Sequence, residues 1–483
     1  MMKTIRYICM SDLHFGAGSS LFTSMKPPTQ DEKTGRLTAR RGSRILRQFA
    51  RSLRLLAKKH SRPGKRPTLV LNGDILELAL ADLDDALTVF EDFLVALFPK
   101  GETPLFDTEI LYLPGNHDHH MWELSREEEY IRRRKKNAPP FHTVSADRAD
   151  GLRSPLLEET LRRVRADLKV RVSYPNLALS ADDRTVVIHH GHFTERIYYQ
   201  ISQMRNLIFP GRTAPQTLEE IESENFAWID FFWSTLGRSG PAGKDLELIY
   251  NKLHDPTQTE KMLHRFAIQV SAKNHPPSIW DTIRGTLVYI VIRAATRRIL
   301  DTEIHQGKEP LNESSRKLMQ WYLSVPVKHQ IGDVKRLGFL FGHTHKPFSE
   351  NVSLEDGASV DVYNSGGWVV ETPDVIESHG GNLLLLDEKL VCYPLHVFNE
   401  GEFTPDAMLP EGDRLKGMIV NGIRRRRMRL IRRIQSEGTM YEKVLLMTKG
   451  KEWKKHLGSG LASGPKKKKR KKSQKPRKSR SNS

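Results

Sequence analysis

The sequence predicts an α/β protein with layered sheets and helices. Short apolar runs of strand length alternate with segments of helical periodicity along the first third of the chain. Each apolar run ends directly in a cluster of polar or metal-binding side chains. Strand ends are where sites commonly form in folds of this class. Together these features indicate an α/β fold that carries its chemistry at the ends of its strands.

The expected elements of the first third follow one another as strand, helix, strand, helix and strand. A short apolar run at residues 5–10 is the first strand, and helical spacing at residues 37–60 follows it. The second strand, the second helix and the third strand are expected at residues 69–71, 83–98 and 110–113. This alternation is typical of an α/β sheet.

A long gap separates the fourth expected strand, residues 186–188, from the next one, residues 337–341. Connections within α/β units take about 2 to 6 residues plus a helix, so the gap must hold a subdomain of its own. Segments with helical periodicity in the gap are residues 219–236, 260–270, 282–299 and 315–323. We therefore predict a helical insertion at residues 193–335 within a core formed by residues 1–192 and 336–400.

The end of the chain changes character twice. Apolar runs at residues 360–363 and 383–398, the latter with a turn at 387–389, are expected to complete the core. Residues 401–457 are expected to form a basic helical extension. The Gly, Ser, Pro and Lys content of residues 458–483 predicts a disordered tail.

Composition excludes several classes of protein. With 38% hydrophobic residues and 33 glycines in 483 positions, the chain is neither wholly disordered, nor collagenous, nor a continuous coiled coil. Cys9 and Cys392 lie in apolar runs and cannot form a disulfide framework, which favours a reducing compartment. The longest uncharged apolar stretch, residues 285–292, is far shorter than the roughly 20 residues of a membrane span. We therefore expect a cytoplasmic protein without a transmembrane segment.

Five clusters of potential metal ligands follow the apolar runs. They are Asp12-Leu13-His14, Gly73-Asp74, Gly115-Asn116-His117-Asp118, His190-Gly191 and Gly342-His343-Thr344-His345. Residues at i and i+2 after a strand can face the same side. Imidazole and carboxylate ligands in such numbers suit Mn, Fe or Zn better than Mg or Ca alone. A mixed set with a central carboxylate indicates two divalent metal ions.

These five clusters resemble the pattern of the calcineurin-like metallophosphoesterase family, which reads D-x-H, G-D, G-N-H-D or G-N-H-E, H and G-H-x-H. The resemblance covers residues 1–195 and 335–400. It implies a metallophosphoesterase-type β-sandwich of two sheets flanked by helices. It also implies hydrolysis of a phosphorylated substrate, in which two metal ions acidify a bridging water and clamp the phosphate.

The resemblance implies a role for each cluster residue. The expected metal ligands are Asp12, His14 and His345 for one ion, Asn116, His190 and His343 for the other, and Asp74 for both. His117 would lie beside the scissile phosphate and donate a proton or hydrogen bond to the leaving oxygen, and Asp118 would orient it. Because His189 and His192 flank the fourth cluster, only the match to the family pattern selects His190.

A run of large apolar side chains marks the insertion, at Phe226, Trp228, Ile229, Phe231, Phe232 and Trp233. Such a run most often forms the buried core of a helix. The alternative is an apolar lid or groove for an acyl group.

A narrower resemblance supports that alternative, since residues 74–77 and 342–347 and the place of the insertion are similar to the UDP-diacylglucosamine pyrophosphatases. The chain departs from that group at His117 and His192, where the group has Arg and Asp. The departures favour ordinary phosphatases or phosphodiesterases.

Three alternatives to a phosphatase or phosphodiesterase stay open. One is a nuclease acting on DNA or RNA, and another is a sugar-nucleotide or lipid pyrophosphatase. The third is a non-catalytic binding module on the same scaffold, against which the complete ligand set argues.

The net charge of +19 is concentrated near the end of the chain. Residues 466–480 hold eleven Lys or Arg and no acid, and residues 424–433 hold seven arginines with apolar residues at helical spacing. A run of this kind is usually a solvated tail, and its charge density attracts nucleic acid or an anionic membrane surface without specificity. In a eukaryote it would resemble a nuclear localisation signal.

Overall fold

The computed structural model describes residues 4–26, 29, 38–62, 64–134, 141–144, 151–209, 211, 213–235, 310–354, 356–401 and 405–437. The helices predicted at residues 260–270 and 282–299 and the predicted tail lie outside these residues. The domain boundaries given above stay predictions. Within the described residues no helix is both long enough and apolar enough to cross a membrane.

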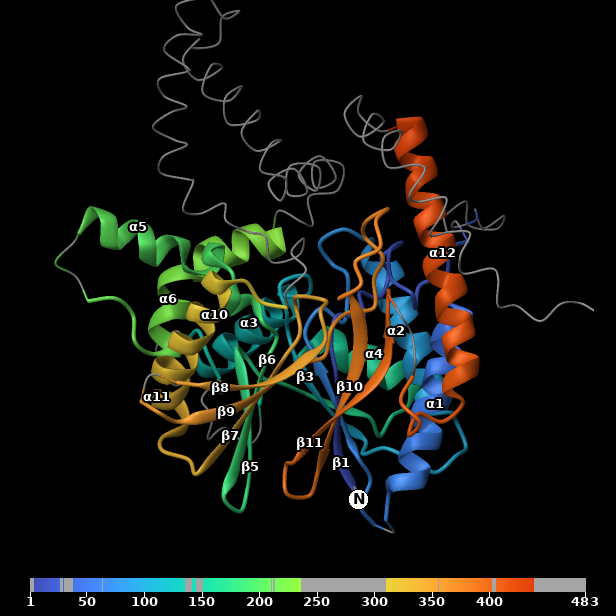
Figure 1. Cartoon of the computed structure of the whole chain (residues 1–483), viewed down its shortest axis with the longest axis horizontal. Coiled ribbons are helices and arrows are strands. Elements are labelled where there is room, and N and C mark those ends of the chain that lie inside the picture. The colour runs from blue at the N-terminus through green and yellow to red at the C-terminus, as the bar shows by residue number, and fades with distance from the viewer. Residues whose placement is uncertain are drawn as a thin grey trace, which may run out of the picture. The chain divides into compact units, whose positions relative to one another are not determined.

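Two β-sheets form the centre of the fold (Figure 1). The six-stranded sheet has the order β11-β10-β1-β2-β3-β4, with bounds Cys392–Asn399, Gly380–Asp387, Ile5–Met10, Thr68–Asn72, Glu109–Leu113 and Lys169–Val172. The five-stranded sheet has the order β5-β6-β7-β9-β8, with bounds Asn176–Ala181, Arg184–His189, Arg336–Phe341, Ser359–Asn364 and Phe348–Ser353. Strands β1 to β4 are parallel neighbours, and so are β6, β7 and β9.

Alternation along the strands divides the apolar side chains between three cores. In β2, Leu69 and Leu71 face the helices while Val70 faces the other sheet. In β7, Phe339 belongs to the outer core of the second sheet and Leu340 to the core between the sheets. Because the side chains of a strand alternate between its two faces, both sheets are covered on both sides. The predicted β-sandwich flanked by helices is confirmed.

Helices cover the outer face of each sheet. Those packed with the six-stranded sheet include α1 (Arg44–His60), α2 (Leu83–Leu97), α3 (His120–Arg134) and α4 (Pro155–Val164). The segment between β6 and β7 contributes α5 (Gln200–Ile208), α6 (Leu218–Ile229) with the π-helical turn η3 (Asp230–Thr235), α10 (Glu313–Tyr322) with η4 (Leu323–Val327), and α11 (Lys328–Ile331). Short 3-10 turns η1 (His192–Thr194) and η2 (Arg196–Tyr199) lead from β6 into it.

Local signals explain where these helices begin. The Ser43 side chain accepts a hydrogen bond from the Leu46 backbone N–H at the start of α1. At the start of α6, Thr217 and Glu220 form a reciprocal capping box. Such caps satisfy backbone N–H groups that have no partner within the helix.

The basic helix α12 (Gly412–Glu437) lies within residues 401–457, where a basic helical extension is predicted. Its first half packs in the same core as α1, through Leu415, Ile419 and Ile423. Gly422 allows this approach, because a Cβ there would lie 2.5 Å from Ile45 Cδ1. Residues 372–374 and 427–437 belong to a second, small unit.

Candidate metal centre

Parallel strands bring the predicted clusters to one edge of the two sheets. The segments after β1, β2 and β3 carry Asp12 to His14, Asp74, and Asn116 to Asp118. The segments after β6 and β7 carry His190 and the pair His343 and His345. Every residue expected at the metal centre therefore comes from the end of a central strand.

The backbone at these strand ends is held in an unusual conformation. Positive φ angles of 47° to 69° are found at five of the predicted ligands, Asp12, His14, Asp74, His343 and His345. This left-handed region is costly for residues with a Cβ. Neighbouring glycines make room for the ligands, since a Cβ on Gly73 would lie 2.2 Å from His190 Nδ1 and one on Gly342 would lie 2.3 Å from Asp12 Oδ2.

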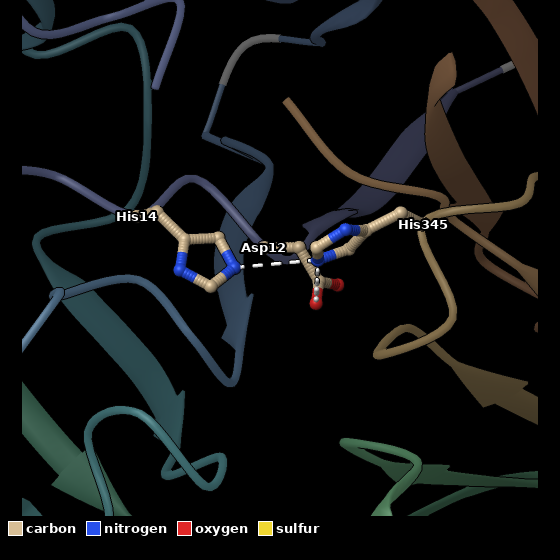
Figure 2. A group of neighbouring side chains, drawn as sticks. All are labelled: Asp12, His14 and His345. Atoms are coloured by element: carbon tan, nitrogen blue, oxygen red, sulfur yellow. Dashed lines mark hydrogen bonds and ion pairs between the residues drawn. The ribbon is translucent and has the colours of Figure 1, made fainter. Parts of the chain in front are cut away.

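A first group of donors is formed by Asp12, His14 and His345, whose ligand atoms lie within 4.8 Å of one another (Figure 2). The Nε2 atoms of His14 and His345 are 3.3 Å apart. His345 Nε2 is 3.4 Å from Asp12 Oδ1. All three side chains are almost completely buried.

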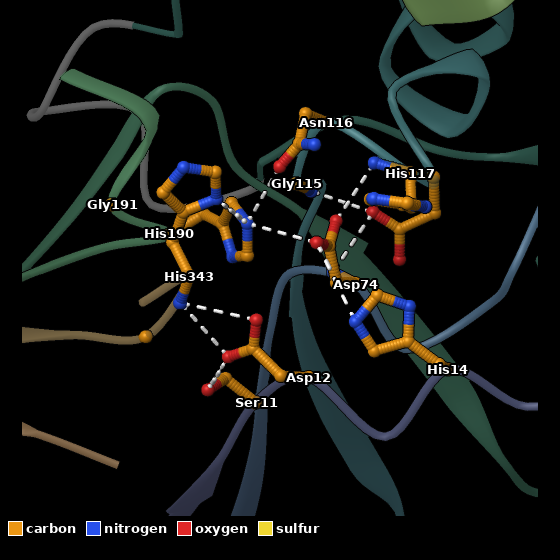
Figure 3. A network of polar contacts seen from close by, with 12 residues as sticks. Ser11, Asp12, His14, Asp74, Gly115, Asn116, His117, His190, Gly191 and His343 are labelled. Carbon is orange, nitrogen blue, oxygen red and sulfur yellow. Dashed lines mark hydrogen bonds and ion pairs between the residues drawn. The ribbon is translucent and has the colours of Figure 1, made fainter. Parts of the chain in front are cut away.

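A second group is formed by Asp74, His190 and His343 (Figure 3). His190 Nε2 lies 3.2 Å from Asp74 Oδ2, 3.0 Å from Asn116 Oδ1 and 3.3 Å from His343 Nδ1. Asp74 Oδ2 also lies 3.8 Å from His14 Nε2, in the first group. The Asp74 carboxylate therefore stands between the two groups.

The chemistry of these donors fits divalent cations. Ring nitrogens and carboxylate oxygens converge in a buried space, where unpaired polar atoms are expensive. Burial raises the pKa of Asp74, but the neighbouring His190 and His117 outweigh it and hold that pKa well below its usual range. Mixed nitrogen and oxygen donors of this kind suit Mn, Fe or Zn.

Two buried glutamates contact ring nitrogens of histidines at the predicted site. Glu77 Oε2 lies 2.9 Å from His14 Nδ1, and Glu77 Oε1 lies 2.8 Å from His117 Nδ1. Glu195 Oε1 lies 2.9 Å from His343 Nε2. Carboxylates in this position fix the tautomer and orientation of a metal-binding histidine. Sequence reasoning missed both, although Glu77 follows Asp74 by three residues and Glu195 follows His190 by five.

His117 lies at the edge of this arrangement. One of its ring nitrogens shares a group with His14 and Asp74, and 18% of its side chain is exposed. Burial lowers the pKa of His117, but the carboxylates of Glu77 and Asp74 outweigh it and raise the pKa to about 10. A cation beside Asp74 would oppose part of this increase, because it neutralises the carboxylate's charge.

The contacts of Asp118 lie with the backbone of two loops and with Tyr112. Its carboxylate accepts hydrogen bonds from the backbone N–H of Gly115 at 2.6 Å and of Ile75 at 2.9 Å, and from the Tyr112 hydroxyl at 2.5 Å. Asp118 thus ties the loop after β3 to the loop after β2, and Glu77 holds the His117 ring.

Comparison with known proteins identifies the family. The family model described as calcineurin-like phosphoesterase matches residues 5–265, more than half of the chain. The chain belongs to this family. The match ends before His343 and His345, which the fold brings to the same site from β7.

The other comparisons do not identify the substrate of this phosphoesterase. A structure search found the phosphopantetheinyl hydrolase of Mycobacterium tuberculosis, at 12% sequence identity and a TM-score of 0.24, covering 76% of this chain and 91% of that one. A likeness at this level does not bear on the substrate. No curated protein matches the chain. The family and the buried His and Asp groups make this chain a metal-dependent phosphoester hydrolase that binds divalent metal.

Side chains from the segment between β6 and β7 contact His119, the residue that follows Asp118. Asp230, in η3, lies 3.0 Å from His119 Nε2 and accepts from Arg126 at 2.5 Å. Trp233 packs edge-on against His119 and His192, with ring centroids 5.4 and 5.0 Å away. In the apolar run, Ile229 and Trp233 are buried, whereas Phe226 and Trp228 are half-buried.

A buried carboxyl group lies inside the insertion. Glu222 of α6 is 1% exposed and accepts a hydrogen bond from the Tyr198 hydroxyl. Burial raises the pKa of Glu222 to about 8. This glutamate is therefore mostly protonated at neutral pH.

Proposed function

We propose that the chain hydrolyses a phosphomonoester or phosphodiester with a pair of divalent ions. The observation that carries the proposal is the place of Asp74, which faces His190 at 3.2 Å and His14 at 3.8 Å through the same oxygen. A single carboxylate between two groups of donors suits a bridging ligand.

The proposed ligands fall on the two sides of this bridge. Asp12, His14 and His345 would hold one ion, and Asn116, His190 and His343 would hold the other. When bound, such ions make a coordinated water nucleophilic at neutral pH and stabilise charge on the phosphoryl oxygens. The donor set favours Mn, Fe or Zn over Mg or Ca.

The remaining residues of the site orient the His117 ring and supply a proton. The carboxylate of Glu77 keeps the His117 ring in place and favours its protonated form, so His117 can donate a proton to the leaving oxygen. The carboxylate of Asp118 binds the backbone N–H groups of both adjoining loops, which keeps His117 at a fixed distance from Asp74. The His117 backbone N–H itself donates to Asp74 Oδ1 at 2.8 Å.

The test is a metal analysis followed by a hydrolysis screen of the purified full chain. We expect two equivalents of bound metal after Mn²⁺ loading. We also expect turnover of p-nitrophenyl phosphate or bis-p-nitrophenyl phosphate. Fewer than two equivalents, or no turnover of any ester by the loaded protein, would contradict the proposal.

The same screen separates the alternative functions. Nucleoside diphosphate conjugates report a pyrophosphatase, and single-stranded and double-stranded DNA report a nuclease. Asp74→Asn is the control variant, because activity that survives in it does not come from this centre.

A further inference from the structure

The basic helix α12 contacts the loop that carries two of the proposed metal ligands. Arg426 is 5% exposed and points inward. Its guanidinium donates to the backbone carbonyls of Ser20 and Thr23, the latter at 2.7 Å. The neighbouring Arg424 and Arg425 are exposed on the same helix.

Short hydrogen bonds connect these carbonyls to Asp12 and His14. The Ser20 hydroxyl donates to the carbonyl of Leu13, the residue between the two ligands, at 2.7 Å. The Thr23 hydroxyl accepts from the Gly16 N–H at 3.0 Å. The loop after β1 therefore folds back on itself, so that Ser20 and Thr23 contact Leu13 and Gly16 near its beginning.

A second connection reaches the same loop through Trp368. The Leu21 N–H donates to the Trp368 carbonyl at 2.8 Å, and the Trp368 N–H donates to the Asp12 carbonyl at 3.0 Å. The ligand loop is thus anchored to Trp368 at Asp12 and at Leu21. The contacts from Arg426, at Ser20 and Thr23, flank the second of these anchors.

The conformation of the two ligands requires such support. Asp12 and His14 have φ angles of 53° and 47°, which are unfavourable for residues with a Cβ. Residues in this region keep their conformation only where the surrounding structure imposes it. The guanidinium of Arg426 suits the task, because the two N–H donors of its Nη2 atom serve both carbonyls at once.

We propose that Arg426 is a positioning residue for Asp12 and His14, through its clamp on the Ser20 and Thr23 carbonyls. The proposal rests on the proposed two-metal function. It makes α12 as far as Arg426 part of the catalytic unit and gives one arginine of the basic helix a role distinct from that of its exposed neighbours.

The alternative is that Arg426 only fixes α12 to the core. In that case Arg426→Lys would lower the melting temperature without a selective effect on metal. Under the proposal the variant weakens the ion held by Asp12, His14 and His345. The lysine side chain is one atom shorter, so its ammonium does not reach the place of Nη2, the atom that donates to both carbonyls. Loss of a group hydrogen-bonded to a ligand typically weakens metal binding about 10 to 100-fold. Arg426 acts through the Ser20 and Thr23 carbonyls rather than on a ligand, so we expect the lower end of this range, roughly tenfold.

The experiment measures Mn²⁺ binding to the full chain by calorimetry, together with the melting temperature. His345→Ala shows which equivalent belongs to the Asp12 side, since only the other equivalent should remain in that variant. We expect Arg426→Lys to weaken the equivalent that His345→Ala abolishes and to leave the other unchanged. Arg424→Lys and Arg425→Lys make the same chemical change on exposed positions and should leave both equivalents unchanged.

A second variant protects the test against a folding defect. Ser20→Ala removes the hydroxyl that reaches Leu13 and leaves Arg426 intact. It should weaken the same equivalent, and its effect should not add to that of Arg426→Lys, because both act through one connected set of contacts.

Unchanged affinities in both variants, or equal weakening of both equivalents, would overturn this inference alone. A wild-type protein that binds fewer than two ions would overturn the proposed function and this inference with it.

Discussion

Replacing Glu77 by glutamine should impair metal binding and proton donation at the same time. The wild-type carboxylate accepts at both oxygens, from His14 at 2.9 Å and from His117 at 2.8 Å. Glutamine offers one carbonyl oxygen and one NH₂ group, so only one of the two histidines keeps an acceptor, and neither keeps a negatively charged one. The other loses its orientation or adopts the wrong tautomer. Because Glu77 is 2% exposed, water cannot replace the missing acceptor.

The size of the two effects can be estimated separately. Loss of a carboxylate behind a metal-binding histidine weakens metal binding about 10 to 100-fold. Loss of a positioned general acid lowers the rate about 10² to 10⁴-fold. At limiting Mn²⁺ both effects should appear, and at saturating Mn²⁺ only the second should remain.

The assay compares aryl phosphates whose leaving groups differ in pKa, at limiting and saturating Mn²⁺. The Glu77→Gln variant should lose most activity on the poorest leaving group at every metal concentration. Glu195→Gln is the matched control, because Glu195 holds His343 on the other side of Asp74. It should weaken metal binding without a leaving-group effect. A Glu77→Gln protein with wild-type metal affinity and an unchanged response to leaving groups would refute the reasoning.

Four further predictions follow from the site and the sequence. Asp74→Asn should reduce both equivalents of bound metal in a mass-spectrometric analysis, and an active variant with two ions would contradict its bridging role. His117→Ala should keep its metal but lose roughly 10² to 10⁴ in rate, with a smaller loss for p-nitrophenolate; equal losses across leaving groups would indicate a purely electrostatic role. Since the pKa of Glu222 is raised to about 8 in the folded chain, stability should fall by up to about 1.4 kcal/mol per pH unit between the unfolded carboxyl pKa and pH 8. The stability of Glu222→Gln, measured by melting curves, should not decline across this pH range. A decline equal to that of the wild-type protein would contradict this prediction. Truncation after residue 458 should leave small-ester hydrolysis unchanged and flatten the salt dependence of DNA binding by about 0.9 in slope per lost phosphate contact; identical slopes would show that the tail does not touch DNA.

The sequence predicts the strand ends better than the contacts made there. Asp12, Asp74 and His343 could be placed together because each follows an apolar run, and the ends of parallel strands share an edge. The support by Glu77 and Glu195 could not be predicted, because it depends on how the turns after β2 and β6 fold back toward the site. The contacts of Asp118 could not be predicted for the same reason, since they depend on how the loops after β2 and β3 fold.

The missed strands have a different explanation. β4 and β8 are edge strands with exposed polar positions, such as Lys169 and Glu350, so their alternation is weak. β5 belongs to a hairpin whose outer strand is partly exposed. The apolar signal that identified the central strands is diluted at all three.

At the five ligands with a left-handed backbone conformation, metal binding and backbone stability make opposite demands on the residue. Each of the five positions, Asp12, His14, Asp74, His343 and His345, would be relieved of about 1 kcal/mol of backbone strain by a glycine. Glycine would also remove the ligand, so the backbone strain is relieved at the same step in which the metal is lost. A variant library selected for heat resistance alone should accumulate glycines at these positions, and one selected for turnover should exclude them.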